Sequence, residues 1–156
     1  RLHTGTVEVV PGVTLHPVGG HTPGSQVVRV NTGRGWIVLA SDAAHLWANI
    51  RERSPFPILD DLAQTLEAFD VIDALADGED HVIPGHDPLI AQRFARWNED
   101  SHIFCLHQPP TQTTQGGAPL IWAPDWGRPP PHHPRRTPRS ILDLKMGKQI
   151  MLLDLS

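Results

Sequence analysis

The chain has 156 residues, 39% of them hydrophobic, and a formal net charge of −4, so it is long and apolar enough for one domain with its own core. The charge is uneven: residues 1–100 contain 7 Lys/Arg against 14 Asp/Glu, and residues 101–156 contain 6 against 3. The acidic first part lacks the clustered basic residues of nucleic-acid binders, so no nucleic-acid partner is expected.

The cysteine and apolar content indicate the cellular location and exclude some kinds of metal site. Cys105 is the only cysteine, which excludes an intrachain disulfide and a multi-cysteine metal site and favours a cytoplasmic location. No apolar run approaches the roughly 20 residues that cross a bilayer, so no membrane association is expected. The sequence starts with Arg-Leu-His-Thr rather than Met and has no signal-peptide pattern; we expect this start to be an interior point of a longer chain or a processed end.

Four β-branched runs open the chain. The runs 6–10 (TVEVV) and 13–18 (VTLHPV) flank Pro11-Gly12, and the runs 26–32 (QVVRVNT) and 35–41 (GWIVLAS) flank Gly33-Arg34. Each pair predicts a hairpin, because Pro-Gly and Gly-X-Gly sequences are turn signals.

Helical periodicity follows. Apolar residues recur every three or four positions over 59–76, with Asp60 or Asp61 suited to cap the start and Gly78 to close the end. The stretch 80–88 (DHVIPGHDP) predicts a short strand, a turn and a second helix with Asp87 as N-cap and Pro88 in the first turn. Strands followed by helices predict an α/β fold with helices packed on the sheet.

The pattern changes near residue 101. Residues 109–138 contain nine of the 16 prolines and little periodic apolar sequence, which is typical of a segment that does not fold. We therefore expect two parts, a folded domain over 1–100 and a Pro-rich, disordered tail over 101–156. The end of the tail, 141–156, is apolar enough to dock as a strand or short helix. Removal of 107–156 is expected to leave stability and metal affinity nearly unchanged.

Three candidate metal ligands each follow a predicted strand: His21 in GGHTPGS, Asp42 in LASDA and His86 in VIPGHD. Strand ends along one edge of a sheet converge, and loops held there by a rigid sheet often carry function. Each residue alone is more typical of a structural position, but together, on Gly- and Pro-rich turns, they indicate a metal site. Neutral imidazoles with a carboxylate suit Zn²⁺ or a similar divalent ion.

These motifs, in this order and spacing, resemble the metallo-β-lactamase superfamily, and the run from GGHTPGSQ to LWANI with PFPI and VIPGHDP resembles its N-acyl-homoserine lactonase branch over about residues 8–96. The resemblance implies the C-terminal half of an αββα sandwich with two zinc ions at the sheet edge. It implies His21 on the first zinc, Asp42 bridging both and His86 on the second. The implied activity is hydrolysis of a small lactone or ester, namely opening of the N-acyl-homoserine lactone ring (quorum quenching).

Two departures from the family pattern matter. The H-x-H-x-D-H motif, which holds the family's largest ligand group and lies upstream in its members, does not occur in residues 1–156, so we expect this chain alone to be inactive. The chain also has no tyrosine, whereas the lactonases often place one shortly after the bridging Asp. His45 occupies that region and is either a catalytic hydrogen-bond donor to the reacting oxygen or a surface histidine on a helix.

Alternatives stay open. A zinc β-lactamase is disfavoured because Cys105 lies in the wrong segment, and a glyoxalase-II-like enzyme because the Pro-rich tail cannot form that family's helical region. Another esterase or thioesterase of the same fold, or a non-catalytic fragment, remains possible. Trp47, Phe56 and Ile58 belong either to an acyl-binding pocket or to the core.

Overall fold

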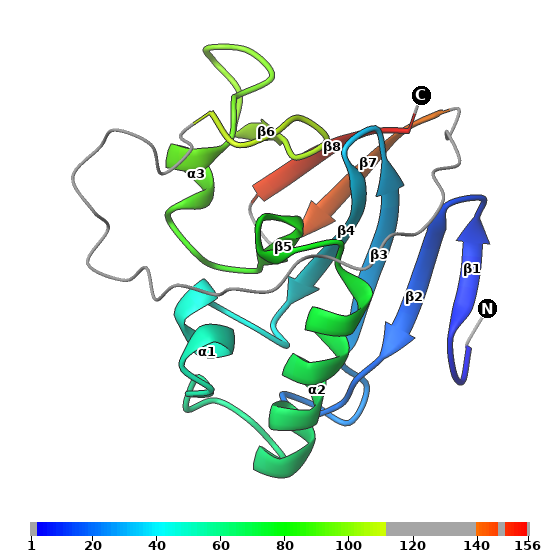
Figure 1. The fold of residues 1–156 in the computed structure, drawn as a ribbon, viewed down its shortest axis with the longest axis vertical. Helices are drawn as coiled ribbons and strands as arrows, with labels where there is room; N and C mark the ends of the chain where they lie inside the picture. Colours follow the sequence, from blue (N-terminus) through cyan, green and yellow to red (C-terminus); the bar gives the residue numbers. More distant parts are fainter. Residues whose placement is uncertain (1–2, 112–139, 147–148, 156) are drawn as a thin grey trace.

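A computed structural model describes residues 3–111, 140–146 and 149–155. Its main feature is a five-stranded sheet of order β1-β2-β3-β4-β5 (Figure 1). The strands are β1 (Val7–Val10), β2 (Val13–Pro17), β3 (Gln26–Thr32), β4 (Gly35–Ser41) and β5 (Val82–Pro84).

Both predicted hairpins are confirmed. The strand β1 pairs antiparallel with β2 around Pro11-Gly12, and Gly12 has the positive φ of +83° that favours glycine. The strand β3 pairs antiparallel with β4, and the pair Thr32–Gly35 leaves Gly33 and Arg34 as a two-residue turn. Such short turns follow from the local sequence, because the turn residues alone select the connection.

The strand β5 pairs in parallel with β4. Because β2 and β4 are each antiparallel to β3, β2, β4 and β5 run in the same direction and end at one edge of the sheet. Figure 1 shows the ends of β2 and β4 on the side where helices α1 (Trp47–Arg51) and α2 (Leu62–Leu75) lie. This edge is where the predicted ligands follow their strands.

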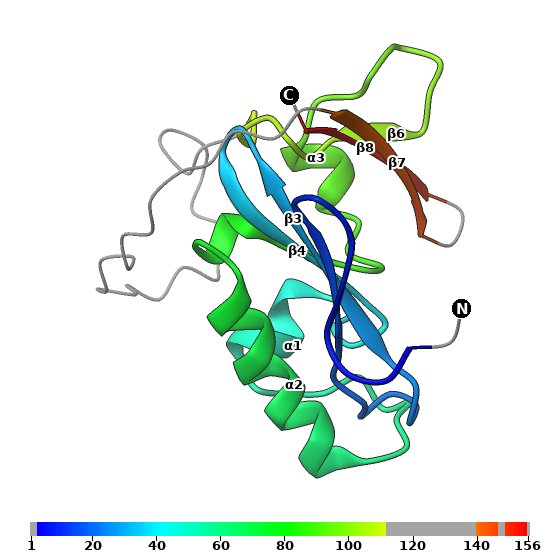
Figure 2. The same ribbon diagram turned by 90° about the vertical axis from the view of Figure 1, so that its right-hand side faces the viewer.

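The helix α2 covers one face of the sheet (Figure 2). Its buried Phe69 and Ile72 pack in a cluster with sheet residues that include Val27, Val38 and Val82. Of the two predicted caps, Asp61 rather than Asp60 is the N-cap, and its side-chain oxygen accepts a hydrogen bond from the Gln64 N–H at 2.9 Å.

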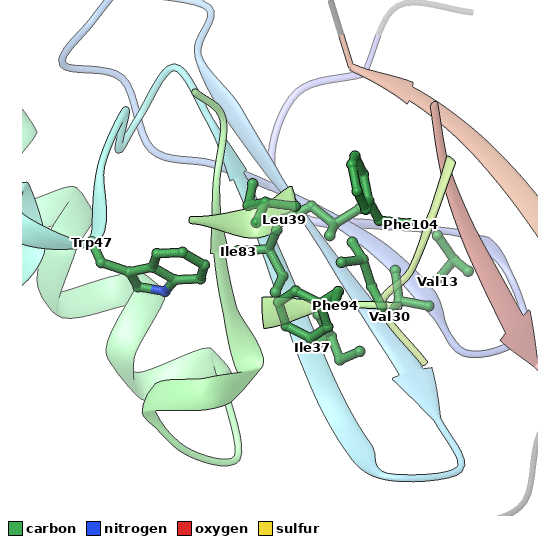
Figure 3. Close-up of a cluster of buried hydrophobic side chains, with 10 residues drawn as sticks. Val13, Val30, Ile37, Leu39, Trp47, Ile83, Phe94 and Phe104 are labelled. Carbon is green, nitrogen blue, oxygen red and sulfur yellow. The ribbon is translucent and has the colours of Figure 1, made fainter. Parts of the chain in front are cut away.

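A second cluster covers the opposite face. Figure 3 shows buried side chains from the sheet against side chains that come from outside it; the members are Val13, Val30, Ile37, Leu39, Ile83, Trp47, Ile90, Phe94, Phe104 and Leu106. Because alternate residues of β4 enter the two clusters, both faces of this strand are buried, as its uninterrupted apolar run predicts.

The second predicted helix is much shorter than expected. The helix α3 spans only Ile90–Arg93, and its N-cap position is Leu89 rather than Asp87. The Asp87 carboxylate instead accepts hydrogen bonds from the backbone N–H groups of Leu89 and Trp47, both at 2.9 Å. A short 3₁₀ turn, Glu79–His81 (η1), precedes β5.

Three strands lie in the predicted tail: β6 (Ile103–Cys105), β7 (Ser140–Met146) and β8 (Gln149–Leu155), in the order β6-β8-β7. Phe104 and Leu106 belong to the core, so packing continues past residue 100. The expected disordered stretch 109–138 falls, from residue 112 onward, outside the described residues, and the domain boundary stays a prediction. In the described part, no helix has the length and apolarity needed to cross a bilayer.

Candidate metal centre

The turn before His21 is held against the start of α2. Gly19 and Gly20 have φ values of +65° and +82°, and a Cβ on Gly20 would lie 2.8 Å from backbone atoms of Thr65. The carbonyl of Gly20 accepts hydrogen bonds from the N–H groups of Asp60 and Asp61, each at 2.9 Å. Two glycines are therefore required here for backbone conformation and close approach.

The side chain of His21 has a defined tautomer. Its Nδ1 lies 2.7 Å from the carbonyl oxygen of Ile58, and because a carbonyl only accepts, Nδ1 carries the proton. The lone pair is then on Nε2, as in metal-binding histidines whose other nitrogen donates to a backbone carbonyl.

The second and third predicted ligands are in direct contact. Asp42 follows the last residue of β4, and its Oδ1 lies 2.6 Å from Nε2 of His86, which follows β5 by two residues. The approach of their loops is close: a Cβ on Gly85 would lie 2.6 Å from the carbonyl oxygen of Ser41. Ser41 has an unusual positive φ of +50°, so the backbone bends as β4 ends.

His45 lies beside this pair. Ligand atoms of Asp42, His45 and His86 are all within 4.8 Å of one another. The His45 ring stacks on the ring of His86, with centroids 5.0 Å apart and planes at 25°, and on Phe56 at 4.3 Å and 18°. His21 is outside this group of three, and its ring is edge-on to His45 at 5.4 Å.

Burial lowers the pKa of His45 below its ordinary value; the neighbouring His86 and His21 lower the pKa further and Asp42 opposes them. The imidazole is therefore neutral at pH 7, the form that binds metals. The side chains of His86 and Asp42 are 54% and 46% exposed, so the group opens to solvent.

Two positions that sequence reasoning did not assign to the site hold it in place. Asp87, which is only 5% exposed, joins the loop after β5 to the backbone of Trp47. The Asn49 side chain accepts a hydrogen bond from the Leu46 N–H and donates one to the Ser54 carbonyl, both at 2.8 Å. In the sequence, Asp87 follows His86 of a Pro-Gly-His turn. This pattern predicts a helix N-cap and gives no indication of the contact with Trp47.

Two hollows adjoin the group. One is lined by apolar side chains such as Phe56 and Ile58 together with His45, and the other by polar side chains such as Thr22 and Gln26 together with His21 and Asp42. Trp47 is 3% exposed and belongs to the core, so only Phe56 and Ile58 of the three pocket candidates line this space.

The donor atoms fit a divalent transition-metal ion. Two imidazoles and a carboxylate are ligands that Zn²⁺ uses, at about 2.0–2.2 Å per bond. Ligands of one tetrahedral ion are about 3.4 Å apart at those bond lengths. Asp42 and His86, whose atoms are 2.6 Å apart, must therefore separate slightly, and any pair near the 4.8 Å limit of the group must move closer. The residue types and placement thus suit zinc better than Ca²⁺ or Mg²⁺, which prefer oxygen ligands.

No protein-family model and no curated protein matches the sequence. Solved structures do match. An N-acyl homoserine lactone hydrolase with the product N-hexanoyl-L-homoserine bound at its catalytic metal centre is 29% identical, with a TM-score of 0.53, and a variant of B. thuringiensis AiiA with N-decanoyl-L-homoserine bound at the active site gives the same values. Each match covers 59% of this chain and 37% of the other.

A probable metal-dependent hydrolase from Staphylococcus aureus is 15% identical, with a TM-score of 0.51, and the match covers 72% of this chain and 38% of that one. At this identity the likeness shows the fold alone. Because the matches cover only 37% and 38% of the other chains, this chain spans well under half the length of these hydrolases. Its described fold is part of a metallo-β-lactamase fold, and in fold and sequence it resembles the N-acyl homoserine lactonases.

Proposed function

We propose that this chain supplies one part of the active site of a zinc-dependent hydrolase that opens lactone rings, with N-acyl-homoserine lactones as substrates. The observation that carries the proposal is the group formed by Asp42, His45 and His86 at the ends of two parallel strands. The similarity to solved lactone hydrolases supports the reaction class.

In the complete enzyme, His21, Asp42 and His86 are proposed as ligands of two zinc ions. Asp42 has two carboxylate oxygens, so it can reach both ions, and the Nε2 lone pair of His21 is available because Nδ1 donates to Ile58. Zinc held by these residues would lower the pKa of a water molecule and polarise a carbonyl group. His45 is suited to two roles in this site, hydrogen bonding to the reacting oxygen or metal binding.

The reaction needs one water molecule. Its oxygen adds to the lactone carbonyl carbon, the ring C–O bond breaks, and the released ring oxygen takes up a proton to give an acid and an alcohol. The side chains of Phe56 and Ile58, which are 37% and 64% exposed, are proposed to contact the acyl chain, because their apolar surface would be removed from water on binding.

The ligand set in this chain is incomplete for two ions. Three residues shared between two ions leave each with fewer than the three protein ligands of catalytic zinc sites, and the matched part is 37% of the related lactone hydrolase. We therefore propose that residues 1–156 alone do not turn over lactones.

The test is a chimaera. The N-terminal part of a solved N-acyl homoserine lactone hydrolase, including its H-x-H-x-D-H segment, is joined to residues 1–156, loaded with zinc and assayed for acid release from N-hexanoyl-homoserine lactone, an ester and a thioester. We expect lactone turnover by the chimaera, none by residues 1–156, and loss of turnover with Asp42→Ala.

Three outcomes contradict the proposal or part of it. A folded, zinc-loaded chimaera that hydrolyses none of the three substrates excludes the hydrolase function, and preference for the thioester or the ester excludes the lactone assignment. Turnover by residues 1–156 alone that disappears with Asp42→Ala would show that the ligand set is sufficient as it stands.

A further inference from the structure

His45 lies in one group with Asp42 and His86. We propose that Asp42, His45 and His86 form a binding site for one divalent ion of the zinc class, which residues 1–156 bind without further ligands and without His21. The proposal rests on the proposed function only for the presence of metal at this edge of the sheet, and it assigns His45 a different role from the one its position in the sequence suggests.

The backbone fixes the two histidines side by side. The N–H of Gly85 donates to the carbonyl of Ala44, and the N–H of His86 donates to the carbonyl of His45, both at 3.0 Å. At the next residue after His86, the Asp87 carboxylate accepts a hydrogen bond from the N–H of Trp47. The loops after β4 and β5 are thus joined at three successive positions, and the spacing of the two imidazoles does not depend on a flexible segment.

The ring of His45 stacks on two other rings. Phe56 stacks at 4.3 Å and His86 at 5.0 Å, with interplanar angles of 18° and 25°. These contacts restrict rotation of the His45 ring. Because the planes of His45 and His86 are nearly parallel, one of the two rings must turn before the in-plane lone pairs of both meet at one ion.

The nitrogens of His45 are also free to bind. Among the residues that the structure describes, neither ring nitrogen of His45 makes a hydrogen bond, whereas His21 already uses Nδ1 on the Ile58 carbonyl. His45, with Asp42 and His86, is within the 4.8 Å group, and His21 is not. A half-buried imidazole that has no hydrogen-bond partner in the described part of the chain, beside a carboxylate and a second imidazole, is the arrangement expected of a ligand.

Two nitrogens and one carboxylate oxygen determine the class of ion. Zinc, cobalt and copper bind imidazole well, and three protein ligands with one open position is a common zinc arrangement. Mg²⁺ prefers oxygen ligands in octahedral geometry, so it is the matched negative control.

The test measures metal binding alone. Zn²⁺ is titrated into residues 1–156 and three variants, His45→Gln, His86→Gln and His21→Gln, against a chromophoric chelator, with circular dichroism to check folding. We expect His45→Gln and His86→Gln each to weaken Zn²⁺ binding by about tenfold or more, since even residues behind the ligands affect affinity by that factor. His21→Gln is expected to change binding less than threefold, and Mg²⁺ not to compete.

A second measurement uses the unaltered chain, so it does not depend on variants that fold. In long-range ¹H–¹⁵N spectra, a ring nitrogen of His45 is expected to shift on Zn²⁺ addition, together with one of His86. Three results would each overturn the proposal. They are equal Zn²⁺ affinity of His45→Gln and the unaltered chain, no shift of the His45 ring nitrogens, and a loss of Zn²⁺ affinity confined to His21→Gln and His86→Gln. None of these results depends on hydrolysis. A chimaera without turnover would therefore not contradict the proposed metal site, and a chain that fails to bind Zn²⁺ through His45 would not contradict the proposed hydrolase function.

Discussion

At the scale of single residues, the candidate metal centre depends on backbone contacts that leave no room for a side chain. Gly20 lies against Thr65 at the start of α2, and Gly85 lies against the carbonyl of Ser41. Both glycines hold a loop that carries a predicted ligand, His21 in the first case and His86 in the second. A methyl group at either position meets backbone atoms, which cannot move aside as the end of a flexible side chain can.

Gly85→Ala tests this contact. The added Cβ would lie 2.6 Å from the Ser41 oxygen, so the two loops must separate, and we expect a loss of about 1–3 kcal/mol in the free energy of unfolding. Urea unfolding followed by circular dichroism measures the loss, and Zn²⁺ affinity should fall with it.

Gly24→Ala is the matched control, because a Cβ there has no atom within 4 Å, and we expect a change within about 0.5 kcal/mol. Equal stability of the two variants would show that the loops after β4 and β5 do not need this contact.

At the scale of elements, the start of α2 supports the His21 turn. Asp61 caps the helix through its side chain, and its own N–H donates to the Gly20 carbonyl. The apolar spacing over 59–76 predicts this helix, but periodicity does not distinguish Asp60 from Asp61 as the cap. The choice depends on where the Gly20 turn meets the chain.

Asp61→Ala is expected to destabilise the protein by about 1 kcal/mol, the usual cost of losing an N-cap, and to lower the thermal unfolding midpoint. The expected effect of Asp60→Ala is near zero, because only its backbone N–H has a hydrogen bond among the described contacts of this turn. Differential scanning calorimetry of both variants makes the comparison, and an Asp60→Ala loss as large as that of Asp61→Ala would contradict this assignment of the cap.

At the scale of the whole molecule, the candidate metal centre and Leu106 lie at different ends of β4. The Arg34 side chain, from the β3–β4 turn, donates to the Leu106 carbonyl at 2.8 Å, whereas Asp42 follows the other end of β4. A strand of seven residues spans about 23 Å at roughly 3.3 Å per residue. Leu106 is therefore remote from the candidate ligands.

Deletion of residues 112–156 tests that separation. The cut keeps Phe104 and Leu106 in the core and the hydrogen bond from the Thr111 N–H to the Arg93 carbonyl, but it removes the pairing of β6 with β8. We expect Zn²⁺ affinity to stay within about twofold, because the ligand loops make their contacts within residues 19–87.

Limited proteolysis of the uncut chain is the companion measurement. Rapid cleavage within 112–139 that leaves a resistant piece ending after Leu106 agrees with the expected dispensable tail. A tenfold loss of Zn²⁺ affinity on deletion would show instead that the C-terminal strands support the metal centre.

The sequence alone predicted what depends on neighbours in the chain. Turn residues and strand patterns predicted both hairpins, apolar spacing predicted α2, and the positions of His21, Asp42 and His86 after strands marked one edge of the sheet. These features are local because a turn or a helical face is specified within a few residues.

Only the tertiary structure decided which of those side chains meet. It placed His45 with Asp42 and His86 and left His21 outside that group, and it directed Asp87 to the Trp47 backbone, so that α3 begins later than predicted. Each of these outcomes depends on contacts between the loops after β4 and β5, which are about forty residues apart in the chain. Patterns within one segment carry no information on such distances, because they are set by how two strands pair and how closely their loops then approach.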